Sequence, residues 1–334
     1  MEANVNVQDF RGRKISETGM PLVTIGVLSY NNAPFIRETL DSVYGQSYGN
    51  IELVIVDDCS TDNSLNIITE WIKAYNLKCN LIIHDRNYGI CRTCNDVIKN
   101  ASGKYISLFG SDDIMNEMRI EKLVHEMEQA GEEYALCHSS CEAIDQNGQH
   151  IGIYNVEGYQ RQGYIFDMLL ERKIFISAPS VLIRKSVYDK VGLYDERLYA
   201  EDFGMWTKLL PLYKVKFSQY IGVKYRIIGG EKRYNTEQLK QRIQRYHKDR
   251  IFIYIECLKI LKTTKEWPKQ EQDIKKKVEF HLIRLQQCKS PYFATMLGYL
   301  LRHFFWRLDY KILLMNRIRQ LSPGYKENYH WNFE

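Results

Sequence analysis

No stretch of this sequence is apolar for long enough to cross a membrane. The most apolar region, residues 296–307, is interrupted by basic residues, whereas a spanning helix needs about 20 predominantly apolar residues. Residues 1–20 are polar and contain no apolar core of the kind found in secretion signals. We therefore expect a cytoplasmic protein, with peripheral attachment to the inner face of the plasma membrane as an open alternative.

Two kinds of binding site are also disfavoured by what the sequence lacks. Ser29 to Asn32, after the first predicted strand, include no glycine, so a glycine-rich triphosphate loop of the nucleotidyltransferase kind is not expected. The eight cysteines fit free thiols in a reducing compartment. The spacings of Cys91/Cys94 and Cys137/Cys141 suggest zinc. The first pair, however, opens a predicted helix and the second follows a predicted strand, so zinc is not favoured.

Charge is unevenly distributed along the 334 residues. Residues 231–334 contain 22 Lys and Arg against 11 Asp and Glu, while the remaining residues contain 24 against 30. The sign of the charge therefore changes near Gly229-Gly230, which predicts a boundary there. We expect a polar lead over residues 1–20, a main domain over residues 21–230 and a basic helical extension over residues 231–334.

Four apolar runs, each followed by a polar loop and then a helical pattern, occupy the first part of the sequence. The runs cover residues 23–30, 51–56, 81–83 and 105–109. Alternation of strands and helices at this spacing is typical of right-handed βαβ units, which assemble a parallel sheet. The sequence thus predicts an α/β fold with a mostly parallel sheet flanked by helices.

Polar residues follow these predicted strands, and in a parallel sheet they gather at one edge. The expected crevice is lined by Ser29, Tyr30, Asp57, Asp58, Asn87, Arg92, Asp112 and Asp113. Asp112 and Asp113 are the most informative, because adjacent carboxylates repel one another unless a cation or proton lies between them. Carboxylates at a strand end suit Mg²⁺ or Mn²⁺ bound to a diphosphate, while a surface turn with solvated acids is the alternative.

Five motifs together resemble the family 2 glycosyltransferases of the GT-A fold in their order and spacing. They are residues 21–31, residues 55–62, Asn87-Tyr88-Gly89-Ile90, Ser111-Asp112-Asp113 and Glu201-Asp202. The resemblance covers about residues 20–230. It implies a Rossmann-like sheet, a nucleotide-sugar donor bound across the strand ends, and a divalent metal ion.

The resemblance assigns the nucleotide to the first strand ends. Asp57 would accept a hydrogen bond from the imide N–H of uracil or thymine, which suits a carboxylate because it is acceptor-only. Tyr30 would offer an aromatic face to the base, and Ser29 a small polar contact. Helix capping is the structural alternative for Asp57, and core packing is the alternative for Tyr30. The other expected contacts are Asp58, for which capping is also an alternative, Asn87 and Arg92.

The resemblance also places the metal. Asp112 would ligate the Mn²⁺ or Mg²⁺ ion that bridges the two phosphates, and Asp113 would be a further contact near the ion. The family usually has another acid two residues before that aspartate, where this sequence has Gly110. This departure removes one candidate contact to ribose or metal and leaves the affinity for the ion open.

Glu201-Asp202 precedes a helical pattern that includes Trp206. The resemblance makes Asp202 the general base that takes the proton from the acceptor hydroxyl as that oxygen attacks the anomeric carbon. One base without a carboxylate nucleophile implies inversion of the anomeric configuration. Glu201 and Trp206 are the expected acceptor contacts. Alternatively, the two acids only cap a helix, and Trp206 belongs to the core.

The basic extension is predicted to form three helices, over residues 238–261, 270–288 and 292–321. Aromatic and basic residues alternate in the third helix, so it could lie on an anionic membrane surface or pack on the main domain. No nucleic-acid motif accompanies the basic residues, so nucleic acid is not an expected partner.

The sequence thus predicts an inverting glycosyltransferase of EC class 2.4 that uses a UDP- or dTDP-activated sugar. The expected acceptor is a glycan or lipid-linked saccharide in bacterial surface-polysaccharide synthesis. A non-catalytic nucleotide-sugar- or glycan-binding partner of an envelope-assembly complex is the alternative from another functional class. The departure at Gly110 keeps this alternative open, and Asp202 disfavours it.

Overall fold

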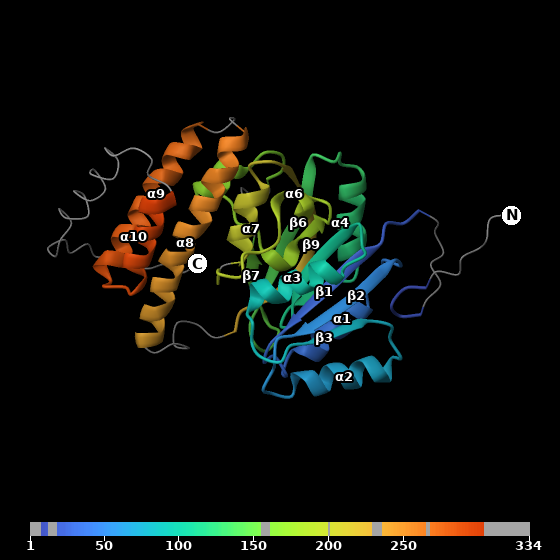
Figure 1. Ribbon diagram of the computed structural model, residues 1–334. Helices are drawn as coiled ribbons and strands as arrows, with labels where there is room; N and C mark the ends of the chain where they lie inside the picture. Colours follow the sequence, from blue (N-terminus) through green and yellow to red (C-terminus); the bar gives the residue numbers. More distant parts are fainter. Residues whose placement is uncertain are drawn as a thin grey trace. The chain divides into compact units, whose positions relative to one another are not determined.

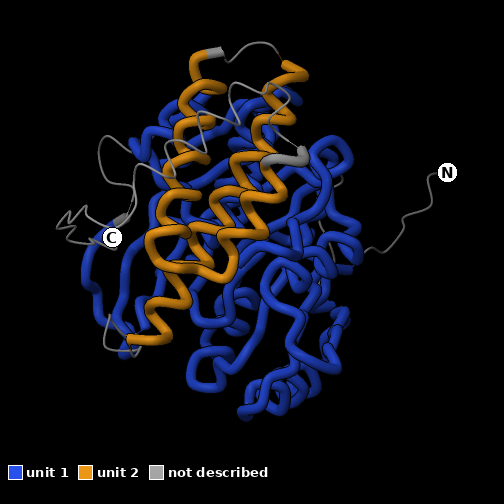
Figure 2. Tube along the Cα trace, turned by 60° about the vertical axis from the view of Figure 1, so that its left-hand side comes forward, with its two compact units in different colours: residues 1–233 blue, residues 234–334 orange. Residues whose placement is uncertain are grey.

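The computed structural model describes residues 8–12, 19–154, 161–199, 201–228, 236–264 and 268–303. The chain divides into two compact units, residues 1–233 and residues 234–334 (Figure 2). The first unit mixes strands and helices, and the described part of the second consists of helices.

Four parallel strands form one half of the sheet in the first unit (Figure 1). Their order across the sheet is β3-β2-β1-β4, and all four predicted strands are present in the predicted parallel arrangement. The elements are β1 (Val23–Ser29), α1 (Ile36–Tyr44), β2 (Ile51–Asp57), α2 (Ser64–Ala74), β3 (Asn80–Ile83), α3 (Ile90–Asn100) and β4 (Tyr105–Gly110).

Burial explains why the apolar runs form strands. β1 and β2 are buried along almost their whole length, as is typical of parallel strands that helices cover on both faces. α3 packs against β1, β2 and β4, while α1 packs against α2. The fully buried Trp71 of α2 donates from Nε1 to Asp41 Oδ1 of α1 at 2.8 Å, which ties these two helices together.

The other half of the sheet contains both antiparallel and parallel pairs, and most of them join segments far apart in the sequence. β4 pairs with β8, β8 with β6, β6 in parallel with β9, and β9 with β5, while β7 pairs with β6. The elements are β5 (Ile114–Met115), α4 (Arg119–Glu128), β6 (Tyr134–Ile144), β7 (His150–Tyr154), α5 (Phe166–Leu170), the 3₁₀ turn η1 (Ala178–Ser180), β8 (Leu182–Arg184), α6 (Val187–Val191), α7 (Glu201–Leu209) and β9 (Lys214–Arg226).

The direction of the connections reverses between β1 and β4. β2 lies on one side of β1, with Asp57 opposite Ser29, and β4 lies on the other, with Gly110 opposite Leu28. In open α/β sheets such a reversal opens a crevice at the carboxyl ends of the strands, where ligands bind. The end of β4 leads directly into Asp112 and Asp113.

Three helices make up the described part of the second unit. They are α8 (Thr236–Thr264), α9 (Pro268–Gln287) and α10 (Tyr292–His303), and each begins within two residues of its predicted start. Leu258, Ile274 and Leu282 are fully buried where α8 and α9 pack together. The predicted end of the third helix and the predicted boundary at Gly229-Gly230 lie outside the described residues. In the part of the chain that the structure describes, no helix has both the length and the apolar content needed to cross a membrane.

Two details of the sequence prediction are wrong. Cys137 and Cys141 lie inside β6 and do not follow a strand, because this segment continues its pairing with β9. Both thiols are buried, and burial raises the pKa of Cys141 to about 11. Pro34 is a residue type suited to the first turn of a helix, which predicts that the helix after β1 includes it. α1 instead begins at Ile36, and Pro34 lies in a preceding turn, in which the carbonyl oxygen of Asn32 accepts hydrogen bonds from the backbone N–H groups of Phe35 and Ile36.

Candidate active site

A cavity of about 200 Å³ lies at the carboxyl ends of β1 and β4. Leu28 and Gly110 line it from these strands, and Asp113 lines it just beyond β4. Residues from a distant part of the sequence complete the lining. They include Phe175, Pro179, Val181, Glu201, Asp202 and Trp206. Asp113, just after β4, and the two acids that open α7 therefore share one space.

Asp112 and Asp113 both place a carboxylate oxygen near Gly110. A Cβ atom at Gly110 would lie 3.0 Å from Asp112 Oδ1 and 3.4 Å from Asp113 Oδ2, so the glycine leaves room for both acids. Burial, and then the charge of Asp112, raises the pKa of Asp113 well above its usual value. A cation beside the pair would stabilise the ionised form of both side chains.

Arg226, the last residue of β9, holds this acidic pair in place. Its backbone N–H donates to Asp113 Oδ1 at 2.9 Å, and its Nε donates to the carbonyl oxygen of Asp112 at 2.9 Å. Nη2 donates to Glu38 Oε2 at 2.6 Å, and Nη1 donates to the carbonyl oxygen of Asp145 at 3.2 Å. The side chain is 2% exposed, and these hydrogen bonds offset the cost of burying its charge. No local pattern in the sequence predicts a role for Arg226 at this site.

A second buried arginine, Arg119 of α4, fixes the wall of the cavity. Nη1 donates to Ser107 Oγ of β4 at 2.9 Å, and Nη2 donates to the carbonyl oxygens of Pro179 and Val181 at 2.7 and 3.0 Å. Burial lowers the pKa of Arg119 to about 10, so the guanidinium stays charged at neutral pH. Asp113 is among the charged groups that act on it. No local pattern in the sequence predicts a role for Arg119 either.

The acidic pair fits a divalent cation that is held partly by its substrate. Among the described residues, no three His, Cys, Asp or Glu side chains are grouped so that they could hold a metal ion alone. Mg²⁺ usually binds through one or two carboxylates and completes its coordination with phosphate oxygens and water. Asp112 and Asp113, beside a cavity large enough for several atoms of a ligand, match this chemistry.

Glu201 and Asp202 line the cavity from the first turn of α7. Burial, and then the charge of Asp202, raises the pKa of Glu201 to about 8. A protonated carboxyl group beside a carboxylate provides a hydrogen-bond donor and a base in the same place. Trp206 is 3% exposed and donates from Nε1 to the carbonyl oxygen of Ile176 at 3.3 Å. It therefore belongs to the core and also lines the cavity.

Asp57, at the end of β2, is buried beside β1 and does not line this cavity. Its carboxylate accepts hydrogen bonds from Ser29 Oγ at 3.0 Å and from the backbone N–H and Oγ of Ser60 at 2.8 and 2.6 Å. These contacts shape the loop after β2, and a carboxylate with about four acceptor positions can take one further donor. Tyr30 is 45% exposed, so its ring is not part of the core.

Asp58 lies in the loop after β2, Asn87 in the loop that leads to α3, and Arg92 in the first turn of α3, and none of them lines the cavity. Asp58 accepts hydrogen bonds from the backbone N–H groups of Tyr88 and Gly89, both at 2.8 Å. The structure thus brings Asp113, Glu201, Asp202 and Trp206 together around one cavity, with Asp112 adjacent. It places the predicted nucleotide contacts along the adjoining strand ends and loops.

The family of this chain follows from its sequence. A model of glycosyl transferase family 2 matches residues 24–192, about half of the chain. The chain belongs to glycosyl transferase family 2.

Relatives of this family 2 glycosyltransferase share up to about a third of its residues in the matched regions. An uncharacterized glycosyltransferase of Rickettsia prowazekii is 30% identical over 214 residues, which is 62% of this chain and 64% of the relative. A putative teichuronic acid biosynthesis glycosyltransferase of Bacillus subtilis, TuaG, is 33% identical over 102 residues, which is 30% of this chain and 40% of the relative. This chain thus spans less than two thirds of the length of either relative.

Solved structures share the fold of this family 2 glycosyltransferase. Staphylococcus aureus TarS 1–349 in complex with UDP-GlcNAc superposes with a TM-score of 0.59 and 19% identity, covering 90% of this chain and 82% of that one. The mannosyltransferase PcManGT from Pyrobaculum calidifontis, in complex with GDP-Man and Mn²⁺, gives a TM-score of 0.54 at 16% identity, with 94% and 82% coverage. The predicted fold, a GT-A sheet with a helical C-terminal extension, is confirmed.

Proposed function

We propose that this protein moves a sugar from a nucleotide-diphosphate sugar to an acceptor hydroxyl, with inversion at the anomeric carbon. The observation that carries the proposal is the shared cavity, which Asp113 lines beyond β4 and Asp202 lines from α7. A leaving-group site and a base that face one space are what a single displacement requires. Family membership supports transferase activity over the non-catalytic alternative.

In the proposed reaction, Asp202 takes the proton of the acceptor hydroxyl as that oxygen attacks the anomeric carbon. The bond between the anomeric carbon and the diphosphate oxygen breaks, and the nucleoside diphosphate leaves with the electron pair. Glu201, which is protonated at neutral pH, can donate a hydrogen bond to the acceptor. A Mn²⁺ or Mg²⁺ ion held by Asp112 and Asp113 would offset the charge that develops on the diphosphate.

The proposed donor carries uridine or thymidine. Asp57 would accept the imide N–H of the base, with the exposed ring of Tyr30 as the stacking surface and Ser29 as the orienting hydroxyl. Asp58, Asn87 and Arg92 would border the same site. The binding of UDP-GlcNAc by TarS supports a uridine donor, whereas the binding of GDP-Man by PcManGT means that the fold does not fix the base.

The proposed acceptor is a glycan or lipid-linked saccharide in the synthesis of a surface polysaccharide. The relationship to TuaG, whose name assigns it to teichuronic acid biosynthesis, supports this class. The basic composition of residues 231–334 fits contact with an anionic membrane surface on the cytoplasmic side, where nucleotide-sugars are made. The protein would then be cytoplasmic or peripheral on that surface.

A thermal-shift screen of nucleotide-sugars, with and without Mn²⁺, tests the donor and the metal together. Ligands that bind the folded state raise the melting temperature by mass action, so UDP- or dTDP-sugars should raise it more when Mn²⁺ is present. Hydrolysis of the best donor is then compared between the wild type and Asp202→Asn. Retained donor binding with lost hydrolysis supports the proposal. Absence of stabilisation by any nucleotide-sugar, or unchanged hydrolysis in Asp202→Asn, would refute it.

A further inference from the structure

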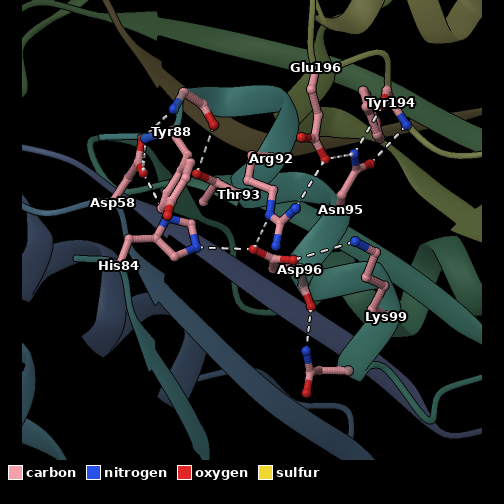
Figure 3. A network of polar contacts seen from close by, with 12 residues as sticks. Asp58, His84, Tyr88, Arg92, Thr93, Asn95, Asp96, Lys99, Tyr194 and Glu196 are labelled. Carbon is pink, nitrogen blue, oxygen red and sulfur yellow. Dashed lines mark hydrogen bonds and ion pairs between the residues drawn. The ribbon is translucent and has the colours of Figure 1, made fainter. Parts of the chain in front are cut away.

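His84 lies between two carboxylates that come from different elements of the first unit (Figure 3). Its Nδ1 is 2.7 Å from Asp58 Oδ1, just after β2, and its Nε2 is 3.1 Å from Asp96 Oδ2, on α3. All three side chains are largely buried. The histidine therefore forms a polar bridge between the end of β2 and the helix that follows β3.

Both ring nitrogens of His84 face an acceptor, so the protonated imidazolium, which has two donors, satisfies both contacts. In either neutral tautomer, one nitrogen would turn a lone pair toward a carboxylate. Asp96 also pairs with two basic side chains of α3. Arg92 Nε donates to Asp96 Oδ2 at 2.8 Å, and Lys99 Nζ lies 3.7 Å from Asp96 Oδ1.

Asp58 in turn fixes the loop that opens α3. Its two carboxylate oxygens accept the backbone N–H groups of Tyr88 and Gly89, each at 2.8 Å. Gly89 has a φ of +88°, so this stretch has a backbone conformation that ordinary side chains rarely adopt. The loop held in this way exposes Arg86, Asn87 and Tyr88, with the Arg86 guanidinium 4.7 Å from the centre of the Tyr88 ring.

We propose that His84 is a positioning residue for the donor site. Hydrogen-bonded to both Asp58 and Asp96, it holds the Tyr88–Gly89 backbone and the end of β2 in the arrangement that receives the nucleotide. The backbone N–H of His84 also donates to the carbonyl oxygen of Asp57 at 2.9 Å, so the residue is tied to both acids of this strand end. The inference rests on the proposed function, because it takes this edge of the sheet to be the nucleotide site.

Two nearly isosteric variants, His84→Gln and Asp96→Asn, remove the bridge. Each is expected to weaken UDP binding in the presence of Mn²⁺ about tenfold by calorimetry. The double variant should be weakened no more than Asp96→Asn alone, because both lack the contact between His84 and Asp96 and both also lose the ion pair of Asp96 with Arg92. The Michaelis constant for the donor should rise by the same factor, while kcat at saturating donor stays within about threefold, because Asp202 is untouched.

Lys99→Gln is the matched control. Lys99 lies on the same helix and pairs with the same carboxylate, but its side chain is 46% exposed and it approaches the oxygen that His84 does not. Exposed ion pairs of this kind contribute little to stability, so the UDP affinity of Lys99→Gln should stay within about twofold of the wild type. If His84→Gln does not fold, Asp96→Asn keeps the test open.

Amide hydrogen exchange at Tyr88 and Gly89, measured without nucleotide, separates this inference from the proposed function. Exchange should be faster in His84→Gln and Asp96→Asn than in the wild type or Lys99→Gln. Exchange rates or UDP affinities that match the wild type in both bridge variants would overturn the role of His84. If exchange is faster in the two bridge variants but the wild type binds no nucleotide, the proposed donor site is rejected. The role of His84 in positioning that site is then rejected as well.

Discussion

At the scale of single residues, the two acids that open α7 are not equivalent. Burial and the neighbouring Asp202 raise the pKa of Glu201 to about 8, so Glu201 holds a proton at neutral pH. Asp202, which we propose as the base, then has the uncharged carboxyl group of Glu201 beside it. Above about pH 8 a second negative charge would appear in the same cavity, where it is poorly solvated.

The first prediction concerns this pair. Asp202→Asn should lower kcat at least about a hundredfold, because general-base catalysis contributes roughly 10²–10⁴ in rate. Glu201→Gln preserves the neutral form and should keep most of the activity at pH 7. Wild-type activity should fall above about pH 8 as Glu201 loses its proton, whereas the Glu201→Gln profile should stay flat there. Initial rates between about pH 6 and 9 check this, and parallel profiles would contradict it.

The second prediction concerns Gly110. In Gly110→Ala the added Cβ would lie 3.0 Å from Asp112 Oδ1 and must displace that carboxylate, so Mn²⁺-dependent UDP affinity should fall about tenfold. Gly152→Ala is the control, since a Cβ at that position meets nothing within 4 Å. Calorimetry with and without Mn²⁺ measures the effect. Equal affinities of the two variants would show that Gly110 is not needed to accommodate the acidic pair.

The sequence predicts the acids that line or adjoin the cavity but not the two buried arginines beside it. Asp112 and Asp202 stand at the ends of recognisable elements, and their motifs carry a family resemblance. Arg119 and Arg226 bind largely main-chain carbonyl groups of segments remote in the sequence. Such partners are set by the long-range pairing of strands, which no local pattern of residue types encodes.

At the scale of secondary-structure elements, α3 connects two parts of the proposed site. One part of the helix carries Asp96, which His84 bridges to the end of β2. Asn95 exchanges hydrogen bonds with the backbone N–H and carbonyl of Tyr194, at 2.8 and 3.0 Å, and donates to Glu196 Oε1 (Figure 3). The segment that leads to α7 is therefore fixed to the same helix as the donor loop.

The third prediction concerns the end of β9. Arg226→Lys loses the guanidinium geometry that serves Asp112, Asp145 and Glu38 together, so the free energy of unfolding should fall by about 2–3 kcal/mol. Mn²⁺-dependent UDP binding should weaken in parallel, because the side-chain hydrogen bond to the carbonyl oxygen of Asp112 is lost, although the backbone N–H of residue 226 can still donate to Asp113. Urea unfolding and calorimetry measure the two effects.

The control for this prediction is Arg197→Lys. Arg197 pairs with Asp195 at the surface and is 51% exposed, so its replacement should cost less than about 1 kcal/mol. If both lysine variants lost the same stability and bound UDP equally well, Arg226 would have no special role at the acidic pair.

A strand or helix could be predicted from the sequence where the elements that it packs or pairs with are close to it along the chain. β1 to β4 and the helices between them follow from apolar runs and turn residues alone. The pairing of β6 with β9 joins distant segments with several shifts of register, and it explains why Cys137 and Cys141 were placed after a strand that in fact contains them.

At the scale of the whole molecule, the uneven charge gives the fourth prediction. Residues 231–334 carry twice as many basic as acidic residues, so the full chain should co-sediment with phosphatidylglycerol vesicles more than with phosphatidylcholine vesicles. Raising the salt concentration should release it, because the Debye length shortens to about 3 Å at 1 M. Binding to neither vesicle would favour packing of the helices on the protein over a membrane role, and equal binding to both would show that anionic lipid is not what attracts them.

The cavity continues past the end of the recognised family domain. The match stops at residue 192, yet α7, with the proposed base, and Arg226 both come later in the chain. A fragment that ends at that limit would retain β1 to β4, where the proposed donor site lies, but would lose Asp202, the proposed base, and the pairing of β9 with β6. An autonomous version of the proposed active site must therefore extend through the last residue of β9.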